Sequence, residues 1–287
     1  MVLLESVPNV SEGRDPAAIA AIGAAFASCA RLLNVHSDPD HHRSVYTLVA
    51  RDGDLVEALF AGISRASELV DLRAHDGIHP RVGAADVVPV VPLDGDMGRA
   101  GTAALALAER VGAELGLPVF LYGESGGGRR PAFFRRGGPE ELQRRVDTGE
   151  LTPAFGPSTL HPTAGAVLIG ARPLLVAFNL ELVEDNLGAA QEIASAVRAS
   201  SGGMAGVQAL GLRLPRSGVV QVSINIIDIA AAPLADVVAL VREEAAARNV
   251  AVRRGELVGM LPEVLVAPAA ELALESLPDT RILERSL

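Results

Sequence analysis

The chain has 287 residues, a formal net charge of −10 and 49% hydrophobic residues. All of its 25 basic side chains are arginine, and the excess of acidic groups argues against general nucleic-acid binding, for which a basic surface is expected. No apolar run approaches the roughly 20 residues of a membrane span, and no basic segment precedes the first apolar residues. With a single cysteine, Cys29, an intramolecular disulfide is excluded. We therefore expect a cytoplasmic protein that contacts no membrane.

Hydrophobic periodicity predicts alternating strands and helices along the first 124 residues. Asp15 followed by Pro16 is typical of a helix N-cap and first turn. The prolines of the strand at 87–91 favour a position at the sheet edge. The predicted strands are 3–7, 32–35, 45–50, 87–91 and 118–124, and the predicted helices are 16–27, 54–70 and 97–115.

Residues 125–162 have an irregular, glycine-rich texture around one short predicted helix at 140–146. A loop of this length inside a compact domain is usually functional or disordered, and Phe133, Phe134 and Phe155 supply anchors that a disordered segment rarely carries. Regular structure resumes after Gly165 with AVLIGA and LLVAFN, which the polar pair Arg172-Pro173 separates. We place a domain boundary there, giving subdomains 1–174 and 175–287.

The second part repeats the alternation of strands and helices. It predicts helices at 187–199, 234–248 and 269–277, and strands at 208–214, 219–228 and 256–261. The expected fold class is α/β, more narrowly α+β. We expect two subdomains of sheet plus helices, ferredoxin-like in character, that pack to leave a ligand groove.

The stretch HDGIHPR places His75 and His79 four residues apart. That spacing on a helix would suit a zinc ion, but Gly77 and Pro80 oppose a helix, so we interpret the stretch as a loop. A histidine titrates near neutral pH, and Arg81 beside His79 can hold a carboxylate or help keep the imidazole neutral. His79 is therefore the candidate for proton transfer.

All six histidines fall in loops or at the ends of predicted elements, which favours a shared site over a core role. They are His36, His41, His42, His75, His79 and His161. Arg43 and the pairs Arg129-Arg130 and Arg135-Arg136 are candidate anion sites. Neither a phosphate-loop lysine nor a GxGxxG motif is present, so a nucleotide site has little support.

Seven collinear segments resemble the formiminotransferase domain of glutamate formimidoyltransferase, which forms half of formiminotransferase-cyclodeaminase in animals. They are VPNVSEGR, DHHRSVYTLVA, AHDGIHPRVGAADVVPVVPL, VFLYGE, FGPSTLHPTAGAVLIGARPLLVAFN, QVSINIIDI and ELVGMLP. The resemblance implies transfer of a formimino group from N-formimino-L-glutamate to N5 of tetrahydrofolate in histidine degradation. It also implies a homodimer, a folate-holding groove between the subdomains, and no metal.

The resemblance assigns site residues by position. His79 falls on the family's general base, and we expect Arg81 and Arg43 to orient substrate carboxylates. His36 stands where the animal enzymes carry an acidic partner of the base, so Asp38 or Asp40 can replace it. The implied folate-binding residues are Gly156, Pro157, Ser158, Thr159, Leu160, His161, Pro162, Thr163, Ala164 and Gly165. Thr163-Ala164 replaces a Ser-Trp pair of the animal enzymes.

Three alternatives remain open from the sequence. The first is formyl transfer from N-formylglutamate, whose donor group differs from the formimino group by one atom. The second is a metal-dependent amidohydrolase that would use His36, His41, His42, His75 and His79 as ligands. The third is a folate-binding protein without catalytic activity.

Overall fold

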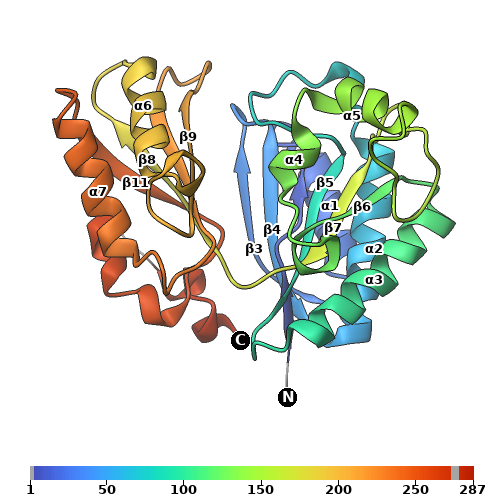
Figure 1. Cartoon of the computed structure of the whole chain (residues 1–287). Coiled ribbons are helices and arrows are strands. Elements are labelled where there is room, and N and C mark those ends of the chain that lie inside the picture. The colour runs from blue at the N-terminus through green and yellow to red at the C-terminus, as the bar shows by residue number, and fades with distance from the viewer. Residues whose placement is uncertain (1–2, 273–277) are drawn as a thin grey trace. The chain divides into compact units, whose positions relative to one another are not determined.

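The computed structural model describes residues 3–272 and 278–287, and the chain divides into two compact units, Met1–Pro173 and Leu174–Leu287. Each unit combines one sheet with helices around its own hydrophobic core (Figure 1). The predicted mixed α/β class is confirmed. Within the described residues no helix combines the length and the apolar character that crossing a membrane requires.

Unit 1, residues 1–173, contains a seven-stranded sheet in which the short strands β1 and β2 follow one another at the same position in the strand order. β1 and β2 both lie between β4 and β5, and both pair antiparallel with each of them. The spatial order is therefore β3, β4, β1/β2, β5, β7, β6. The strands are β1 (Leu4–Ser6), β2 (Asn9–Val10), β3 (Arg31–Asp38), β4 (Arg43–Ala50), β5 (Ala85–Pro92), β6 (Val119–Leu121) and β7 (Val167–Ala171).

The first part of unit 1 has a βαββαβ connection with the split β-α-β order of ferredoxin-like folds. In chain order it runs β1/β2, α1 (Pro16–Phe26), β3, β4, α2 (Asp52–Leu69), β5. α3 (Met97–Glu114) then leads to β6, and β7 inserts between β5 and β6 with parallel pairing on both sides. The helix start predicted at Pro16 is confirmed, since the Asp15 side chain accepts the Ala17 N–H at 2.8 Å and the Ala18 N–H at 3.3 Å.

Helices cover both faces of this sheet. The apolar stripes of α1, α2 and α3 pack with one face in the main core, represented by Phe26, Leu59 and Leu107. The other face packs against α4 (Pro131–Arg135) and α5 (Gly138–Asp147), with Phe134 and Leu142 buried between them and the strands (Figure 1). The region expected to be irregular thus contains a second short helix, α4, which brings polar side chains toward the sheet.

The predicted edge position of the proline-rich strand is wrong, because β5 lies in the middle of the sheet. The register explains how a central strand tolerates Pro89. β5 pairs with β1 at Val91 and with β2 at Val87, so Pro89 lies opposite the break between β1 and β2. Its missing N–H is not needed there. The Ser6 hydroxyl instead donates to the Pro89 carbonyl oxygen at 2.5 Å.

Unit 2, residues 174–287, repeats the βαββαβ connection in a four-stranded antiparallel sheet of order β11, β8, β10, β9. This is the ferredoxin-like order, with α6 and α7 in its core. The elements are β8 (Val176–Leu182), α6 (Leu187–Val197), β9 (Val207–Arg213), β10 (Val220–Ile226), α7 (Leu234–Ala246) and β11 (Val252–Val258).

The helix predicted at 269–277 lies partly outside the described residues, which omit 273–277. Before that gap, Pro268–Leu272 forms a 3-10 helix.

Candidate functional site

The HDGIHPR stretch is a loop in unit 1 between a 3-10 turn, Leu72–Ala74, and β5, as its sequence predicts. His79 is half-buried in it. Its Nδ1 atom lies 2.7 Å from the Pro80 carbonyl oxygen and 3.1 Å from Nη1 of Arg43. The Pro80 carbonyl can only accept and Arg43 can only donate, so the two contacts require opposite states of Nδ1. The shorter contact favours a proton on Nδ1, and Arg43 then acts on the ring through its charge. The Nε2 atom then carries the lone pair that can accept a proton from a substrate.

A buried cluster of charges lies behind this imidazole. Asp86 of β5 is fully buried, and its Oδ2 atom accepts from Nη1 of Arg43 at 3.0 Å and from Nη2 of Arg135. Its Oδ1 atom accepts the Val82 N–H at 2.8 Å. A buried carboxylate is tolerable only with such partners. One aspartate therefore anchors two arginines, one from β4 and one from α4.

The cluster sets the protonation state of His79. Burial, followed by the charges of Arg43 and Arg135, lowers the pKa of His79 well below its usual range. Burial alone would raise the pKa of Asp86, but Arg135 and Arg43 lower it, so the carboxylate is ionised. Burial also lowers the pKa of Arg43, to about 10, which leaves it charged at neutral pH. His79 is consequently neutral at pH 7 and available as a base.

Arg43 and Arg81, the two arginines expected to orient substrate carboxylates, are engaged inside the protein. Arg43 is 7% exposed and also donates from Nε to the Asn9 side chain at 2.8 Å. Arg81 donates to three carbonyl oxygens of its own loop: Gly77 at 2.8 Å, His79 at 3.2 Å and His75 at 2.5 Å. Arg81 therefore holds the loop in place, whereas Asn9 and Asp86 fix Arg43 beside the imidazole.

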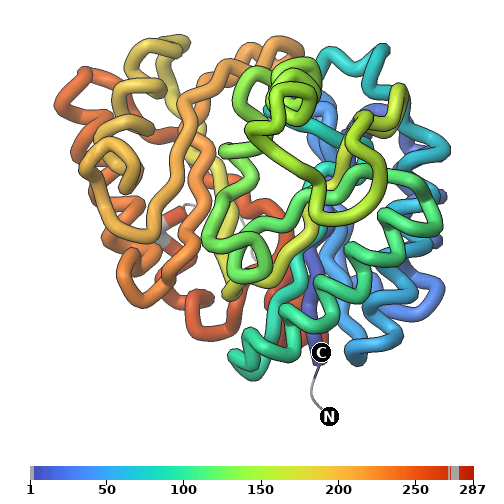
Figure 2. Tube along the Cα trace, turned by 45° about the vertical axis from the view of Figure 1, so that its right-hand side comes forward, coloured from blue at the N-terminus to red at the C-terminus, as the bar shows by residue number. Residues whose placement is uncertain are grey.

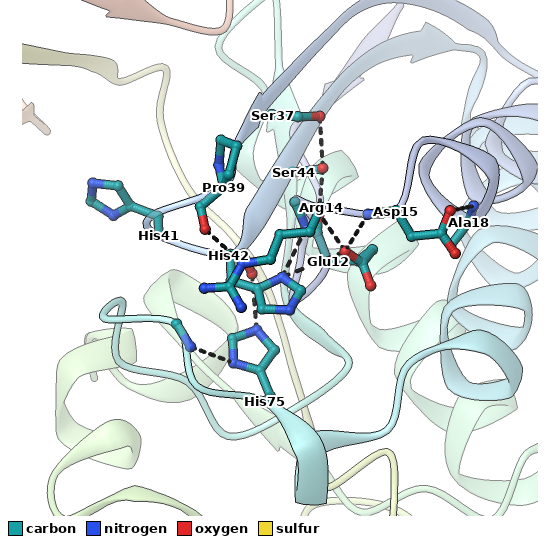
Figure 3. Close-up of polar contacts among 12 residues, drawn as sticks. Glu12, Arg14, Asp15, Ala18, Ser37, Pro39, His41, His42, Ser44 and His75 are labelled. Atoms are coloured by element: carbon teal, nitrogen blue, oxygen red, sulfur yellow. Dashed lines mark hydrogen bonds and ion pairs between the residues drawn. The ribbon is translucent and has the colours of Figure 1, made fainter. Parts of the chain in front are cut away.

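His75 and His42 form a second pair, stacked at 4.1 Å between ring centroids (Figure 3). His75 uses both ring nitrogens on the backbone: Nε2 bonds the His42 carbonyl oxygen at 2.9 Å, and Nδ1 accepts the Gly77 N–H at 3.1 Å. The His42 Nδ1 atom accepts the Gly13 N–H at 3.1 Å. A metal ion could bind His75 only if these bonds broke, which counts against the amidohydrolase alternative.

Two residues of the N-terminal segment VPNVSEGR, Glu12 and Arg14, contact the turn after β3 and the HDGIHPR loop. Glu12 accepts the Arg14 N–H at 2.7 Å and lies 3.5 Å from the His42 ring, and Arg14 donates to the Pro39 carbonyl oxygen at 2.9 Å (Figure 3). Arg14 also pairs with Asp76. Burial lowers the pKa of His75 to about 4 and also lowers that of His42, so both rings are neutral at pH 7. This interlock fixes the loops that carry the candidate site.

The residues expected to orient the base lie on β3 and its turn. His36 pairs in register with Val45 on β4. Asp38 caps the turn, accepting the backbone N–H groups of Asp40 at 2.7 Å and His41 at 2.8 Å. His41 is the turn histidine that approaches the base, with 5.8 Å between its ring centroid and that of His79. Figure 3 shows its ring turned away from the His42–His75 stack.

Sequence reasoning missed His41, Asp86 and Arg135 as partners of His79. A charged residue inside the apolar run AADVVPVV was the available signal for Asp86. The contacts of Arg135 had no local signal, because that residue approaches Asp86 from a distant segment of the chain.

The predicted folate segment, residues 156–165, lies beside the backbone that follows His79. Gly165 forms an antiparallel bridge with Gly83, and the Ala84 N–H donates to the Ala164 carbonyl oxygen at 2.9 Å. A turn closed by His161 and Gly165 ends the loop, with N–H···O distances of 2.9 and 2.8 Å. Residues 156–159 are exposed, and Figure 2 follows the loop (yellow-green) from α5 back to β7. Unit 1 thus brings this segment next to the chain that follows His79.

Comparison with known proteins identifies a matching family and several similar proteins. The formiminotransferase domain, N-terminal subdomain, matches residues 3–172, and the formiminotransferase domain matches residues 177–284. The glutamate formimidoyltransferase of Thermoplasma acidophilum is 41% identical over 100% of this chain and 98% of its own. The glutamate formimidoyltransferase of Streptococcus pyogenes serotype M1 is 36% identical over 95% of this chain and 93% of its own.

The formimidoyltransferase-cyclodeaminase of Sus scrofa is 38% identical over 95% of this chain, which spans 52% of that longer protein. The similarity therefore extends over both units and over almost the full length of the single-function relatives. The chain belongs to the formiminotransferase domain family.

Proposed function

We propose that the chain is a glutamate formimidoyltransferase, which transfers the formimino group of N-formimino-L-glutamate to N5 of tetrahydrofolate. Two relatives with this name match nearly end to end. The observation that carries the proposal is His79, kept neutral by burial and by the charges of Arg43 and Arg135, in the tautomer that leaves a lone pair on Nε2. It lies beside the loop that corresponds to the family's folate segment.

The reaction needs one group that first accepts and then returns a proton. N5 of tetrahydrofolate attacks the formimino carbon, and Nε2 of His79 takes the N5 proton as the tetrahedral intermediate forms. The same proton then passes to the glutamate nitrogen as its bond to the formimino carbon breaks. The products are 5-formiminotetrahydrofolate and L-glutamate. A base that is neutral before substrates bind is suited to the first of these steps.

The remaining residues support His79 or the substrates. Asp86 holds Arg43, whose positive charge beside Nδ1 helps to keep the buried imidazole unprotonated. Arg81 fixes the backbone of its loop. Residues 156–165 receive the pterin, where Thr163-Ala164 supplies no aromatic ring for stacking. We infer that Asp38 acts on the base indirectly, since its Oδ2 atom lies 3.9 Å from Nε2 of His41.

We further propose that tetrahydrofolate is the co-substrate, that the reaction uses no metal, and that the enzyme is a cytoplasmic homodimer. Within the described residues, no three side chains of the metal-ligating types come together as one candidate site, and both ring nitrogens of His75 are engaged by the backbone. The dimer and the cytoplasmic location rest on the resemblance to the family and on the composition.

A two-substrate assay tests the function directly. Initial rates are measured with tetrahydrofolate and formiminoglutamate together, with each omitted in turn, and with formylglutamate as the donor. Transfer that depends on both substrates and favours the formimino donor is the expected result. Transfer from formylglutamate alone would establish formyl transfer, and tight folate binding without any turnover would identify a binding protein. An assay after treatment with a chelator tests the metal-free proposal.

A further inference from the structure

The structure leaves the substrate carboxylates without the partners that the sequence suggests. Nε and Nη1 of Arg43 are bonded to Asn9 and Asp86, and its side chain is buried. Both terminal nitrogens of Arg81 donate to carbonyl oxygens of their own loop. Formiminoglutamate carries two carboxylates, and a further cation near His79 would suit the one closest to the reacting carbon.

Arg135 has the necessary position and charge. It extends from α4 and donates from Nη2 to Asp86, the carboxylate that also pairs with Arg43 beside His79. Two arginines share this one aspartate, so the cluster keeps an excess positive charge. The side chain of Arg135 is 14% exposed, against 7% for Arg43. Among the described residues, its buried Nε atom has no hydrogen-bond partner.

α4 holds Arg135 rigidly. Arg145 of α5 is fully buried, donates from Nη1 to the Phe133 carbonyl oxygen at 2.8 Å, and places its guanidinium 4.5 Å from the centre of the Phe133 ring. It also pairs with Glu150 at 2.7 Å. These contacts anchor α4 at Phe133, and the bond to Asp86 orients the Arg135 guanidinium, whose planar geometry suits a carboxylate.

We propose that Arg135 binds the α-carboxylate of the formimino donor and thereby makes donor specificity and the strength of the base depend on one residue. The chemistry of the two substrates selects this carboxylate. The donor's α-carboxylate is separated from the reacting carbon only by the amidine nitrogen and Cα. The glutamate carboxylates of tetrahydrofolate lie beyond the aminobenzoyl group, far from N5. A carboxylate held close to His79 therefore belongs to the donor.

Donor binding then has an electrostatic consequence for His79. The charged and titratable groups that face this ring are Arg43 on β4, Arg135 on α4 and His41 on the turn after β3, with Arg81 and Asp86 next to them. A carboxylate on Arg135 offsets the excess positive charge, which strengthens the base when the donor is present. The inference rests on the proposed function and adds the donor subsite to it.

The test compares Arg135→Gln and Arg135→Lys with Arg144→Gln, a control on α5 whose side chain is 57% exposed and pairs with Glu141. In Arg135→Gln we expect the KM for formiminoglutamate to rise by about 10- to 100-fold, as for loss of a charge-assisted contact, with the KM for tetrahydrofolate within about twofold of wild type. In the pH profile of kcat/KM, the acid limb of Arg135→Gln moves to higher pH, because loss of a positive charge beside His79 raises the pKa of that ring. Arg135→Lys keeps the acid limb and recovers part of the donor affinity.

Two donor amides separate this role from a structural one. Wild type loses activity on the α-amide, formimino-L-isoglutamine, whereas Arg135→Gln treats the α-amide and the parent donor alike. The γ-amide, formimino-L-glutamine, affects wild type and variant equally. Thermal unfolding of each variant confirms that it is folded.

An unchanged donor KM in Arg135→Gln, or equal discrimination against the α-amide in wild type and variant, would overturn the inference while leaving the proposed function intact. If wild type transfers no formimino group from any donor, the proposed function itself fails, and the inference fails with it.

Discussion

Replacing Asp86 by Asn removes the negative charge that two buried arginines share. The side chain is fully buried, and both Arg43 and Arg135 donate to the same oxygen. Asparagine can still accept the Val82 N–H through Oδ1, but its amide group then replaces Oδ2 and faces both guanidinium groups. Breaking a buried ion pair from one side costs about 3 to 5 kcal/mol, out of a total stability of about 5 to 15 kcal/mol. The variant should therefore fold, with much of its stability lost.

Urea unfolding followed by tyrosine fluorescence measures this loss in the relevant unit. The chain has no tryptophan and two tyrosines, Tyr46 and Tyr122, both in unit 1. The control is Glu68→Gln, since Glu68 pairs with Arg65 at 2.7 Å on the surface of the same unit, with side chains 56% and 42% exposed. It should cost less than about 1 kcal/mol. If Asp86→Asn also costs less than about 1 kcal/mol, the buried cluster does not anchor these arginines as described.

The same variant tests the coupling to the base. Without Asp86, two uncompensated cations remain beside His79 and disfavour its protonated form further. We expect kcat to fall and the acid limb of kcat/KM to move to lower pH, opposite to the shift expected for Arg135→Gln. An acid limb that moves upward would contradict the assignment of charges around the ring.

Three further predictions concern the supporting loops. Burial lowers the pKa of His75 to about 4 in the folded chain, below the usual 6.5, so the unfolded chain binds the proton first and stability should fall as the pH drops from 6.5 to 4. Solvent screening of this half-buried ring limits the loss to about 1 to 2 kcal/mol, and urea unfolding of His75→Gln should show a flatter pH dependence. Arg81→Gln should lower kcat by about tenfold with little change in the donor KM, because lost loop positioning reduces catalysis; steady-state kinetics would reject this role if the donor KM rose instead. Gly165→Ala places a Cβ 2.1 Å from the Val82 carbonyl oxygen at φ +68°, whereas Gly127→Ala, at φ +64°, has open space around the new Cβ. Gly165→Ala should therefore lower the free energy of unfolding by about 1 to 3 kcal/mol more than Gly127→Ala, and it should raise the KM for tetrahydrofolate. Equal free energies of unfolding would contradict this prediction.

Local signals explain which parts of the fold could be predicted. The Asp15 cap and Pro16 define the start of α1, and Gly77 and Pro80 exclude a helix at HDGIHPR, because each acts on its own backbone. The central position of β5 could not be predicted in this way. It depends on a break between β1 and β2 that lies opposite Pro89, more than 75 residues away in the chain.

In the candidate site, too, local signals could be predicted from the sequence and tertiary contacts could not. His79 stands out in the sequence because its neighbours force a loop, but its partners come from β4, β5 and α4. Their sequence positions predict that Arg43 and Arg81 bind anions, and only the structure shows that both donate to acceptors inside the protein. Arg135 lies in a glycine-rich region without helical periodicity, so only the fold brings it to Asp86. Sequence pattern singles out His79 as the candidate base, whereas tertiary structure identifies the charges that surround it.

Formimino transfer by His79→Gln tests the central claim most directly. Glutamine has no titratable ring nitrogen and should leave Arg43 and Asp86 paired, so circular dichroism and the unfolding midpoint should match wild type closely. Loss of a general base lowers turnover by about 10²- to 10⁴-fold, and we expect a kcat reduced within this range at saturating tetrahydrofolate and formiminoglutamate. Near-wild-type turnover in the folded variant would show that another group moves the proton and that His79 is not the base.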